Sequence, residues 1–205
     1  MHGGRALPRR TMLFLTRTLV YAGLALLCVA PALSVPGTAR RMELEDLVRV
    51  CDLAVEGRVV SMRAVRDVRG RIVTEHVLHV RRTHVGLAST LRTVRLPGGT
   101  LPDGTGLLVP GMPRLEVGQE CVLFLSSEDT QGTRMPVGLA QGAWRVTKTK
   151  EGLRRVMRAM EGLAVVDGAR VGEAETHSQL DYAVFVARVE AAKALRSVVT
   201  QPVVK

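Results

Sequence analysis

The sequence predicts a mainly β protein of the α+β class. It is expected to be a small antiparallel β-barrel with a short N-terminal helix and a C-terminal helix packed on it, preceded by a signal peptide. Runs of alternating apolar and polar residues recur between positions 53 and 149, and turn residues separate them, as in the strands of a half-buried sheet. Residues 97–118 are too rich in Gly and Pro for a helix interior, and they lead into residues 121–125, an apolar run of the right length for a buried strand. An apolar stripe at helical spacing follows near the C-terminus.

The segment 1–39 has the three parts of a secretory signal. Four arginines without an acid precede or flank the apolar residues 19–33, and small residues follow them. Cleavage after Ala32 or Ala39 would satisfy the small-residue rule. We therefore expect an exported protein, whether periplasmic, envelope-associated or secreted. An uncleaved anchor over residues 19–35 and lipidation of Cys28 are the alternatives, and the membrane is expected as a partner only through an uncleaved segment.

Composition argues against nucleic acid as a partner. Removing the segment 1–39 takes away four arginines and no acids, so the net charge falls from +10 to +6 for positions 40–205. The arginines are scattered singly, and only four aromatic side chains are left for base stacking. A chain of this length suits one domain with a sizeable core. Charge-driven binding to an anionic envelope surface remains an alternative.

The residues after the signal predict a short helix and then a long hairpin. Residues 42–50 carry apolar side chains at helical spacing and acids in the first turn, where the helix dipole favours them. Residues 53–66 and 72–84 both alternate, and the turn sequence DVRG lies between them. Gly57 within the first strand predicts a bulge or a close approach of another backbone.

Four shorter strands are expected on either side of the Gly- and Pro-rich crossing loop. They span residues 91–96, 121–126, 135–139 and 143–149. For residues 153–160 we choose strand, because the preceding turn fits a meander. Helix remains the alternative there, since an apolar stripe also runs at helical spacing.

Three segments make up the expected domain organisation beyond the signal. The barrel domain, with its lead-in helix, is expected over residues 40–163, and the Gly-containing residues 164–177 are interpreted as a linker. Ser178 can cap a helix over residues 178–199, whose apolar stripe would pack on the barrel.

Two cysteines remain after the signal, in a compartment where disulfides persist. Cys51 and Cys121 each stand at the start of an expected apolar strand, so a disulfide between them is conceivable but not deducible from the sequence. Two buried thiols that pack as small apolar groups are the alternative.

No residue pattern predicts a metal, a cofactor or a catalytic group. His76 and His79 would face opposite sides of a strand. His84 would share a face with His76 but lie too far along the strand to share an ion, so all three are interpreted as solvated or edge histidines. The glycines of residues 98–106 lack the Lys and the helix start of a phosphate-binding loop, and they are interpreted as turn residues.

The order of motifs between positions 52 and 158 resembles a family of uncharacterised bacterial exported proteins. That family has a D-x-x-x-x-G-x-V strand, a T-x-x-x-x-x-V strand, a P-G-G turn, a V-G-[EQ]-E-x-x-L-F-L strand and a G-x-x-Q-G corner. Here these motifs are carried by Asp52, Gly57, Thr74, Pro97, Gly98, Gly99, Gly118, Glu120, Leu123, Phe124, Gln141 and Gly142. More distantly, the chain is similar to netrin-type modules, which are small barrels of oligonucleotide-fold shape and include the tissue inhibitors of metalloproteinases. Those inhibitors chelate zinc through an N-terminal cysteine, and Cys51 lies too far past either cleavage site for the resemblance to imply that mechanism.

We therefore expect a non-catalytic binding module whose partner is a protein or an envelope component. Loops on a rigid scaffold often carry binding, so the crossing loop is the expected contact surface. A hydrolase is the alternative, and it would need a cleft that brings together Glu120, His76 and Asp52. The residues expected to contact the partner are Gly98, Gly99, Asp103, Gly104 and Met112.

Overall fold

A computed structural model describes residues 37–158, 160, 163–167, 170–173 and 179–199 of the 205-residue chain. The chain divides into two units, Met1–Ser34 and Val35–Lys205, and every described residue belongs to the second. The expected signal peptide therefore lies almost wholly outside the described residues. None of the helices that the structure describes is long and apolar enough to cross a membrane.

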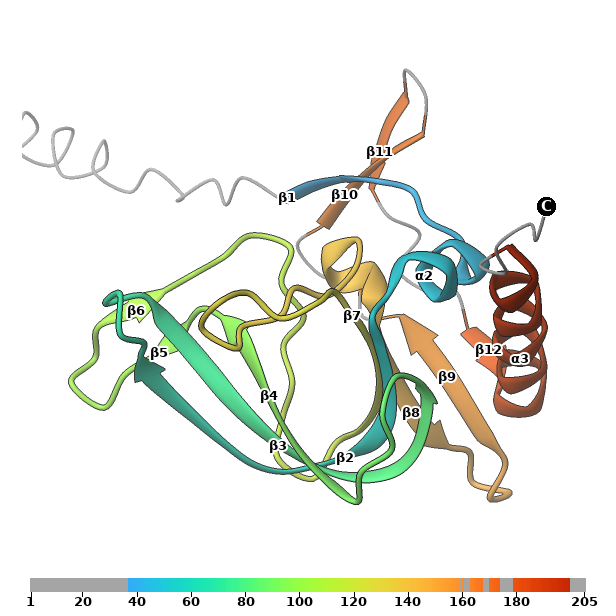
Figure 1. Cartoon of the computed structure of the whole chain (residues 1–205), viewed down its shortest axis with the longest axis horizontal. Coiled ribbons are helices and arrows are strands. Elements are labelled where there is room, and N and C mark those ends of the chain that lie inside the picture. The colour runs from blue at the N-terminus through green and yellow to red at the C-terminus, as the bar shows by residue number, and fades with distance from the viewer. Residues whose placement is uncertain (1–36, 159, 161–162, 168–169, 174–178, 200–205) are drawn as a thin grey trace, which may run out of the picture. The chain divides into compact units, whose positions relative to one another are not determined.

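Seven antiparallel strands form the main sheet, in the order β12-β9-β8-β7-β2-β3-β4 (Figure 1). The structure confirms the mainly β, α+β class and the interpretation of residues 153–160 as a strand, which is β9. The strand bounds are β2 Leu53–Arg66, β3 Ile72–Val85, β4 Leu91–Pro97, β7 Glu120–Leu125, β8 Ala143–Lys148, β9 Arg154–Arg158 and β12 Gln179–Asp181.

The sheet is open, so the expected closed barrel is wrong. β4 and β12 are the two edges of the sheet and do not pair with each other. Beside β4, a loop takes the place of a further strand: the Arg134 N–H donates to the Arg95 carbonyl at 2.9 Å, and Thr133 forms an isolated bridge with Arg95. Alternation predicts which residues form strands and which face they bury. Closure depends on strand tilt and stagger, which no local pattern encodes.

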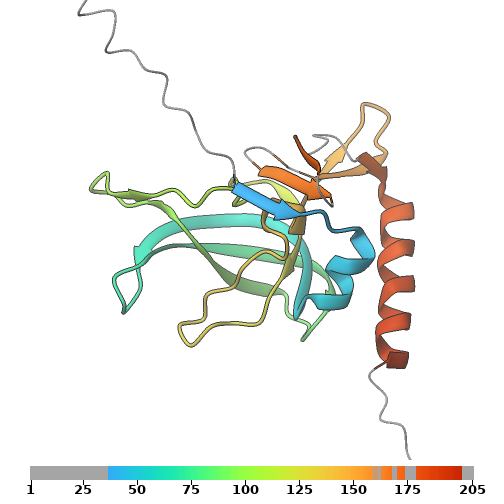
Figure 2. The same cartoon turned by 90° about the horizontal axis from the view of Figure 1, so that it is seen from above.

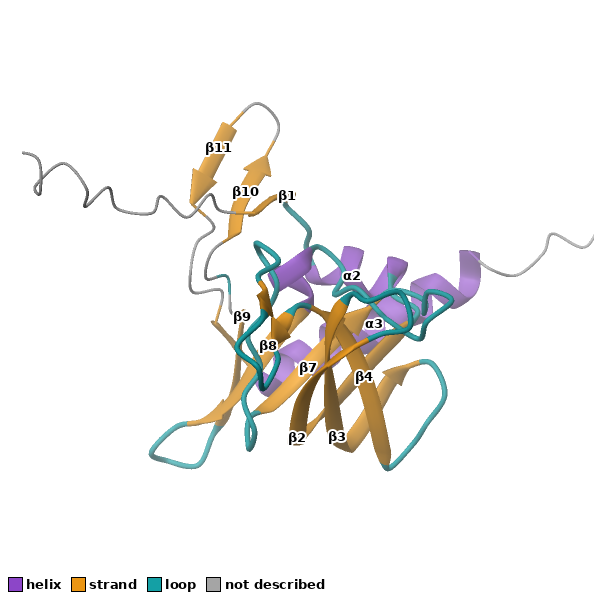
Figure 3. Cartoon of the chain, turned by 90° about the vertical axis from the view of Figure 1, so that its left-hand side faces the viewer, coloured by secondary structure: helices purple, strands orange, loops and turns teal. Residues whose placement is uncertain are grey.

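Two helices, α2 Leu44–Val50 and α3 Tyr182–Val199, pack against one face of the main sheet (Figure 3). They also lie beside each other (Figure 2). This confirms the expected lead-in helix and C-terminal helix. Their core, which we call the helix-side core, contains Leu44, Leu47, Val48, Phe185 and Val189 together with the strand residues Ala54, Val122, Phe124, Trp144 and Val156.

The C-terminal helix begins later than the sequence predicts. Residues 179–181 pair with β9 as β12, and the Asp181 carboxylate accepts a hydrogen bond from the Ala183 N–H at 2.8 Å. Asp181 therefore satisfies a free donor of the first turn, which is the role expected for Ser178. Ser178 itself lies outside the described residues.

The other face of the sheet carries a second apolar cluster, which we call the loop-side core. β7 contributes to both cores, because its alternate residues point to opposite faces. This explains why its sequence, ECVLFL, is almost continuously apolar. The loop-side core contains Leu53, Val55, Val59, Leu78, Val94, Leu96, Leu115, Cys121, Leu123 and Leu125.

β2 and β3 form the predicted long hairpin, and their pairing is irregular at three places. One register shift falls between Glu56 and Gly57, which confirms the predicted irregularity at Gly57. A Cβ atom built on Gly57 would lie 2.6 Å from the carbonyl oxygen of His79, so the two backbones approach closely there. Glycine is required by this approach.

A smaller sheet replaces part of the expected linker. β1 Gly37–Arg40 pairs in parallel with β10 Leu163–Asp167, which pairs in turn with β11 Arg170–Glu173. Leu163 and Val165 are buried, so apolar burial favours strand over linker for this segment.

The structure also differs from the expectation for residues 135–139, which do not form a strand of the main sheet. Only an isolated bridge joins Pro136 to Leu125, and the 3-10 helix η1 Leu139–Gly142 follows. The Gln141 side chain accepts from the Met42 N–H and donates to the Arg40 carbonyl, both at 2.8 Å. These bonds attach the chain entering α2 to the η1 corner.

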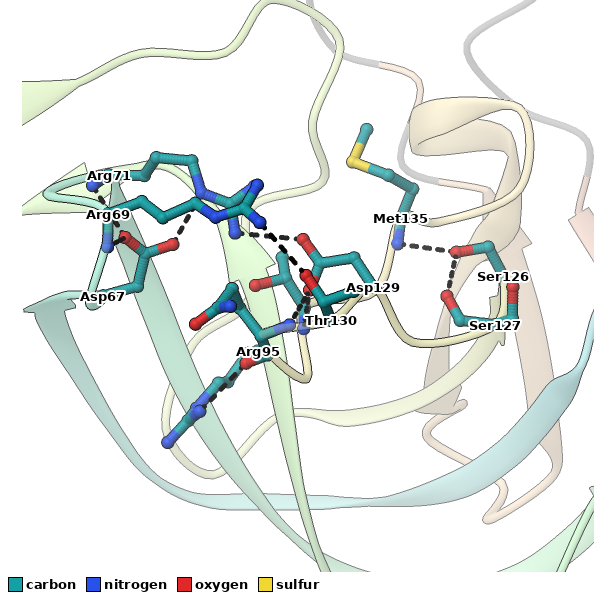
Figure 4. A network of polar contacts seen from close by, with 11 residues as sticks. Asp67, Arg69, Arg71, Arg95, Ser126, Ser127, Asp129, Thr130 and Met135 are labelled. Carbon is teal, nitrogen blue, oxygen red and sulfur yellow. Dashed lines mark hydrogen bonds and ion pairs between the residues drawn. The ribbon is translucent and has the colours of Figure 1, made fainter.

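A polar network fixes the loop of residues 126–136 to the tip of the β2–β3 hairpin (Figure 4). Arg71 bridges two carboxylates, Asp67 at 2.6 Å and Asp129 at 2.9 Å. Asp129 also accepts backbone hydrogen bonds from Gln131 and Thr133 within its own loop. The network therefore holds this loop against β4, at the open edge of the sheet.

Candidate functional site

A groove of about 790 Å³ lies between the crossing loop and the outer part of the main sheet. Residues 98–100 and 106–116 form its wall, and they include the short strands β5 Gly99–Thr100 and β6 Gly106–Leu107. Its floor is formed by β2, β3 and β4 through Met62, Arg63, Ala64, Thr74, His76, Leu96 and Pro97.

Two glycines allow the crossing loop to lie on the sheet. Gly98 and Gly99 have φ values of 96° and 131°, which L side chains rarely adopt. A Cβ atom on Gly99 would lie 2.2 Å from Oγ1 of Thr74. The Thr74 hydroxyl donates to the Gly98 carbonyl at 2.7 Å. The P-G-G turn thus also packs the crossing loop against Thr74 of β3.

The five residues of the crossing loop that are expected to contact the partner fall into two groups in the structure. Gly98, Gly99 and Met112 line the groove. Asp103 and Gly104 are exposed in the turn between β5 and β6 and are not among the lining residues. The Asp103 carboxylate accepts from the Thr105 N–H at 2.8 Å, which is the bond of a turn-forming Asp.

His76 lies on the groove floor and is only 5% exposed, so its interpretation as a solvated histidine is wrong. Burial lowers the pKa of His76, although hydrogen bonds with the backbone of Thr74 and Val94 act in the opposite direction. The imidazole is therefore neutral at neutral pH. Arg63, Thr74 and His76 are the polar residues of the floor, and the other floor residues are apolar.

Several lining residues were missed by sequence reasoning. Met62, Leu107 and Leu108 are apolar side chains that line the groove and remain 42–76% exposed. The signal that could have found them is Leu107-Leu108, an apolar pair within an otherwise turn-forming loop.

β2 has an open edge beside this groove. β7 pairs with β2 only from Leu53 to Arg58, and the turn at Gly118 and Gln119 then binds Val59 through backbone hydrogen bonds of 2.7 and 2.9 Å. Residues 61–66 pair with β3 on one side, and residues 60–66 pair with no described strand on the other. The exposed residues at the start of this edge are Val60, Ser61, Met62 and Arg63.

A second cluster of polar groups is buried on the helix side of the sheet. Glu56, 1% exposed, accepts hydrogen bonds from Arg154 and Tyr182, each at 2.7 Å. His84 Nε2 lies 3.5 Å from the same carboxylate, which is too far for a full hydrogen bond but close enough for an electrostatic contact. Burial acts to raise the pKa of Glu56, but contacts from His84, Arg154 and Tyr182 outweigh it and lower the pKa to about 2.

His84 departs from its expected position. It is buried beside Glu56 on the helix side, whereas His76 lies on the loop side, so the two histidines do not share a face. The register shifts between β2 and β3 explain the difference, since a one-residue shift turns the following side chains over. Among the three histidines of β3, His79 alone is exposed as expected.

The three groups that a hydrolase would need lie in different places. Glu120 forms ion pairs with Arg58, Arg81 and Arg154. Asp52 is bound by Arg134, and His76 lies in the groove. Within the described part of the chain, no three His, Cys, Asp or Glu residues are grouped as a metal site would require.

Cys51 and Cys121 are two free, buried thiols. Cys51 packs in the helix-side core and Cys121 in the loop-side core. Cys121 is paired with Gly57 of β2, and the chain between Cys51 and Gly57 covers roughly 15–20 Å when it is extended. A disulfide requires Cα atoms within about 7 Å, so this fold does not join them.

Comparisons with protein-family models, with curated proteins and with solved structures gave no match. The groove and the open edge of β2 are therefore the features of this chain that bear on its function.

Proposed function

We propose that this chain is an exported, non-catalytic binding module that holds an extended segment of a partner protein in the groove beside β2. The observation that carries the proposal is the open edge of residues 60–66 next to a groove walled by the crossing loop. An extended segment laid along this edge would pair with its free backbone donors and acceptors, as in other cases of β-strand addition.

The side chains of the groove indicate what the partner segment contains. Alternate residues of an added strand point to one face, and here that face would meet Met62, Leu107 and Leu108. We therefore expect apolar residues at every second position of the segment. Arg63 is paired with Glu75 at 3.1 Å, and Arg114 and Glu116 carry opposite charges, so the apolar lining and not a net charge is expected to select the segment.

Export is part of the proposal, and the composition of the segment 1–39 supports it. The similarity to exported bacterial proteins and to netrin-type modules, drawn from the sequence motifs, is consistent with this location. A binding role needs no cofactor, and none enters the proposal.

Selection from a library of random peptides on the purified chain tests the proposal. We expect enrichment of segments with apolar residues at alternate positions. Binding of such a peptide is expected to slow amide hydrogen exchange in residues 60–66, because backbone pairing protects those amides. Scrambling residues 98–113 without loss of the fold is expected to abolish capture.

Matched variants distinguish binding in the groove from nonspecific binding to exposed apolar residues. Met62→Glu and Leu108→Glu place a charge on the lining and are expected to abolish peptide binding. Leu153→Glu changes an exposed apolar residue in the β8–β9 turn and is expected to bind as the wild type does. Equal binding by all three variants, or exchange protection elsewhere than residues 60–66, would overturn the proposal.

A further inference from the structure

A second, smaller cavity lies on the helix side of the sheet, away from the groove. It has a volume of about 170 Å³ and contains a buried guanidinium, that of Arg158. Arg158 lies on β9, paired across the sheet with Trp144 of β8, and its guanidinium carbon is 4.6 Å from the centre of the indole ring. The other lining residues are Arg41, Glu43, Leu44, Leu180 and Arg188.

Arg158 is 8% exposed, its side chain makes no ion pair or hydrogen bond with the described residues, and its Nε is fully buried. Buried cations are normally paired, because an uncompensated charge away from water is costly. Stacking on Trp144 covers one face of the guanidinium but leaves its donors unused. The described part of the chain thus places a cation in a cavity and gives it no anion.

The charged residues described around the cavity act on Arg158 at a distance and do not form an ion pair with it. Arg188 is neutralised by Glu45, which it binds through two bonds of 2.8 Å. Glu43 and Arg41 line the cavity with opposite charges. Burial lowers the pKa of Arg158, and Arg188 and Arg41 add to this effect, whereas Glu43 and Glu45 oppose it. An Arg side chain still remains protonated, so Arg158 keeps its positive charge.

We propose that this cavity binds a small oxyanion, held by the guanidinium of Arg158. The planar fork of Arg donors fits two oxygens of a carboxylate or of a phosphate group. The cavity volume suits a group of that size. This site is independent of the peptide groove, which lies on the other face of the sheet.

Trp144 provides a direct readout, since it is the one tryptophan of the chain and stacks on Arg158. The full-length chain is titrated with acetate, with inorganic phosphate and with sodium chloride at constant ionic strength. We expect a saturating change in Trp144 fluorescence with acetate or with phosphate, and a parallel rise in Tm, because a ligand that binds the folded state stabilises it. The arm that saturates identifies the oxyanion. A response to neither, or an equal response to chloride, overturns the proposal.

Variants of two arginines on β9 complete the test. Arg158→Met removes the charge and is expected to abolish both responses. It is expected to leave the Tm without anion unchanged or higher, since an unpaired buried cation is lost. Arg155→Met lies on the opposite face of the same strand and is expected to respond as the wild type does. Arg158→Lys keeps the charge without the fork, so weaker but measurable binding is expected. A full response in Arg158→Met would refute the assignment.

Discussion

The hydroxyl of Tyr182 donates a hydrogen bond of 2.7 Å to the buried carboxylate of Glu56, which joins the first residue of α3 to β2. Arg154 of β9 binds the other oxygen of this carboxylate at 2.7 Å, and its guanidinium lies 3.8 Å from the centre of the Tyr182 ring. One carboxylate therefore holds two strands and a helix together. The attachment of α3 to the sheet therefore depends in part on the buried, ionised carboxylate of Glu56.

Removal of the Tyr182 hydroxyl is expected to destabilise the protein. Tyr182→Phe keeps the ring over Arg154 but removes a hydrogen bond to a charged group, so we expect the free energy of unfolding to fall by about 1.5–3 kcal/mol. Glu56→Gln is expected to cost more, roughly 3–5 kcal/mol, because it leaves Arg154 without its main partner. Urea unfolding followed by circular dichroism measures both. A loss below about 0.5 kcal/mol in Tyr182→Phe would show that the bond contributes little.

The same carboxylate predicts a loss of stability in acid. The pKa of Glu56 is about 2 in the folded protein against an ordinary value of 4.5, because burial, which acts to raise it, is outweighed by the contacts with His84, Arg154 and Tyr182. Ionised Glu56 therefore stabilises the fold above about pH 4.5, and this stabilisation is lost as the pH falls towards about 2. The expected loss is on the order of 3 kcal/mol.

Glu56→Gln is the reference for this pH dependence, since other carboxylates with lowered pKa, such as Glu75 and Glu45, titrate equally in both proteins. Unfolding free energies measured from about pH 6 to about pH 2 should converge between wild type and variant. Parallel curves over that range would contradict the assignment of a lowered pKa to Glu56.

Local patterns predicted most strands, because alternating apolar and polar residues in the sequence indicate directly which side chains a strand buries. β7 is an example: its apolar run was recognised as a buried strand, and the structure buries it on both faces. Closure of the barrel could not be predicted, since the edge beside β4 is covered by Thr133 and Arg134, which come from a polar turn. The position of that turn depends on ion pairs such as Arg71 with Asp129, which join residues far apart in sequence.

The candidate site was predicted only in part. Gly98 and Gly99 were singled out because their turn sequence is strong, and they line the groove together with Met112. His84 was placed on the wrong face, because alternation was counted through register shifts that the sequence does not reveal. Arg158 was missed altogether, since nothing in its local sequence distinguishes a buried arginine from an exposed one.

Replacement of Gly57 is expected to disturb the main hairpin. In Gly57→Ala the new Cβ would lie 2.6 Å from the His79 carbonyl oxygen, a backbone atom that cannot move without distorting β3. We expect a loss of about 1–3 kcal/mol or more in the free energy of unfolding. Gly106→Ala is the control, because its Cβ would meet nothing closer than 3.4 Å. That variant is expected to lie within about 0.5 kcal/mol of the wild type. Equal stability of both variants would mean that the two backbones are further apart than described.

The two thiols are expected to be unreactive in the folded protein. Burial raises the pKa of Cys51 to about 11 and that of Cys121 to about 12, although Arg196 acts in the opposite direction at Cys51. At about pH 8 no more than roughly one molecule in a thousand carries a thiolate at either position, and the thiolate is the reactive form.

In a Cys28→Ser variant, a thiol reagent should therefore label neither cysteine under native conditions and both in guanidinium chloride. The intact mass should show two free thiols, and a reducing agent should leave the Tm unchanged. The loss of two hydrogens from the mass, together with a Tm that falls on reduction, would show instead that Cys51 and Cys121 are bonded and that the pairing of β2 with β7 differs from the one described.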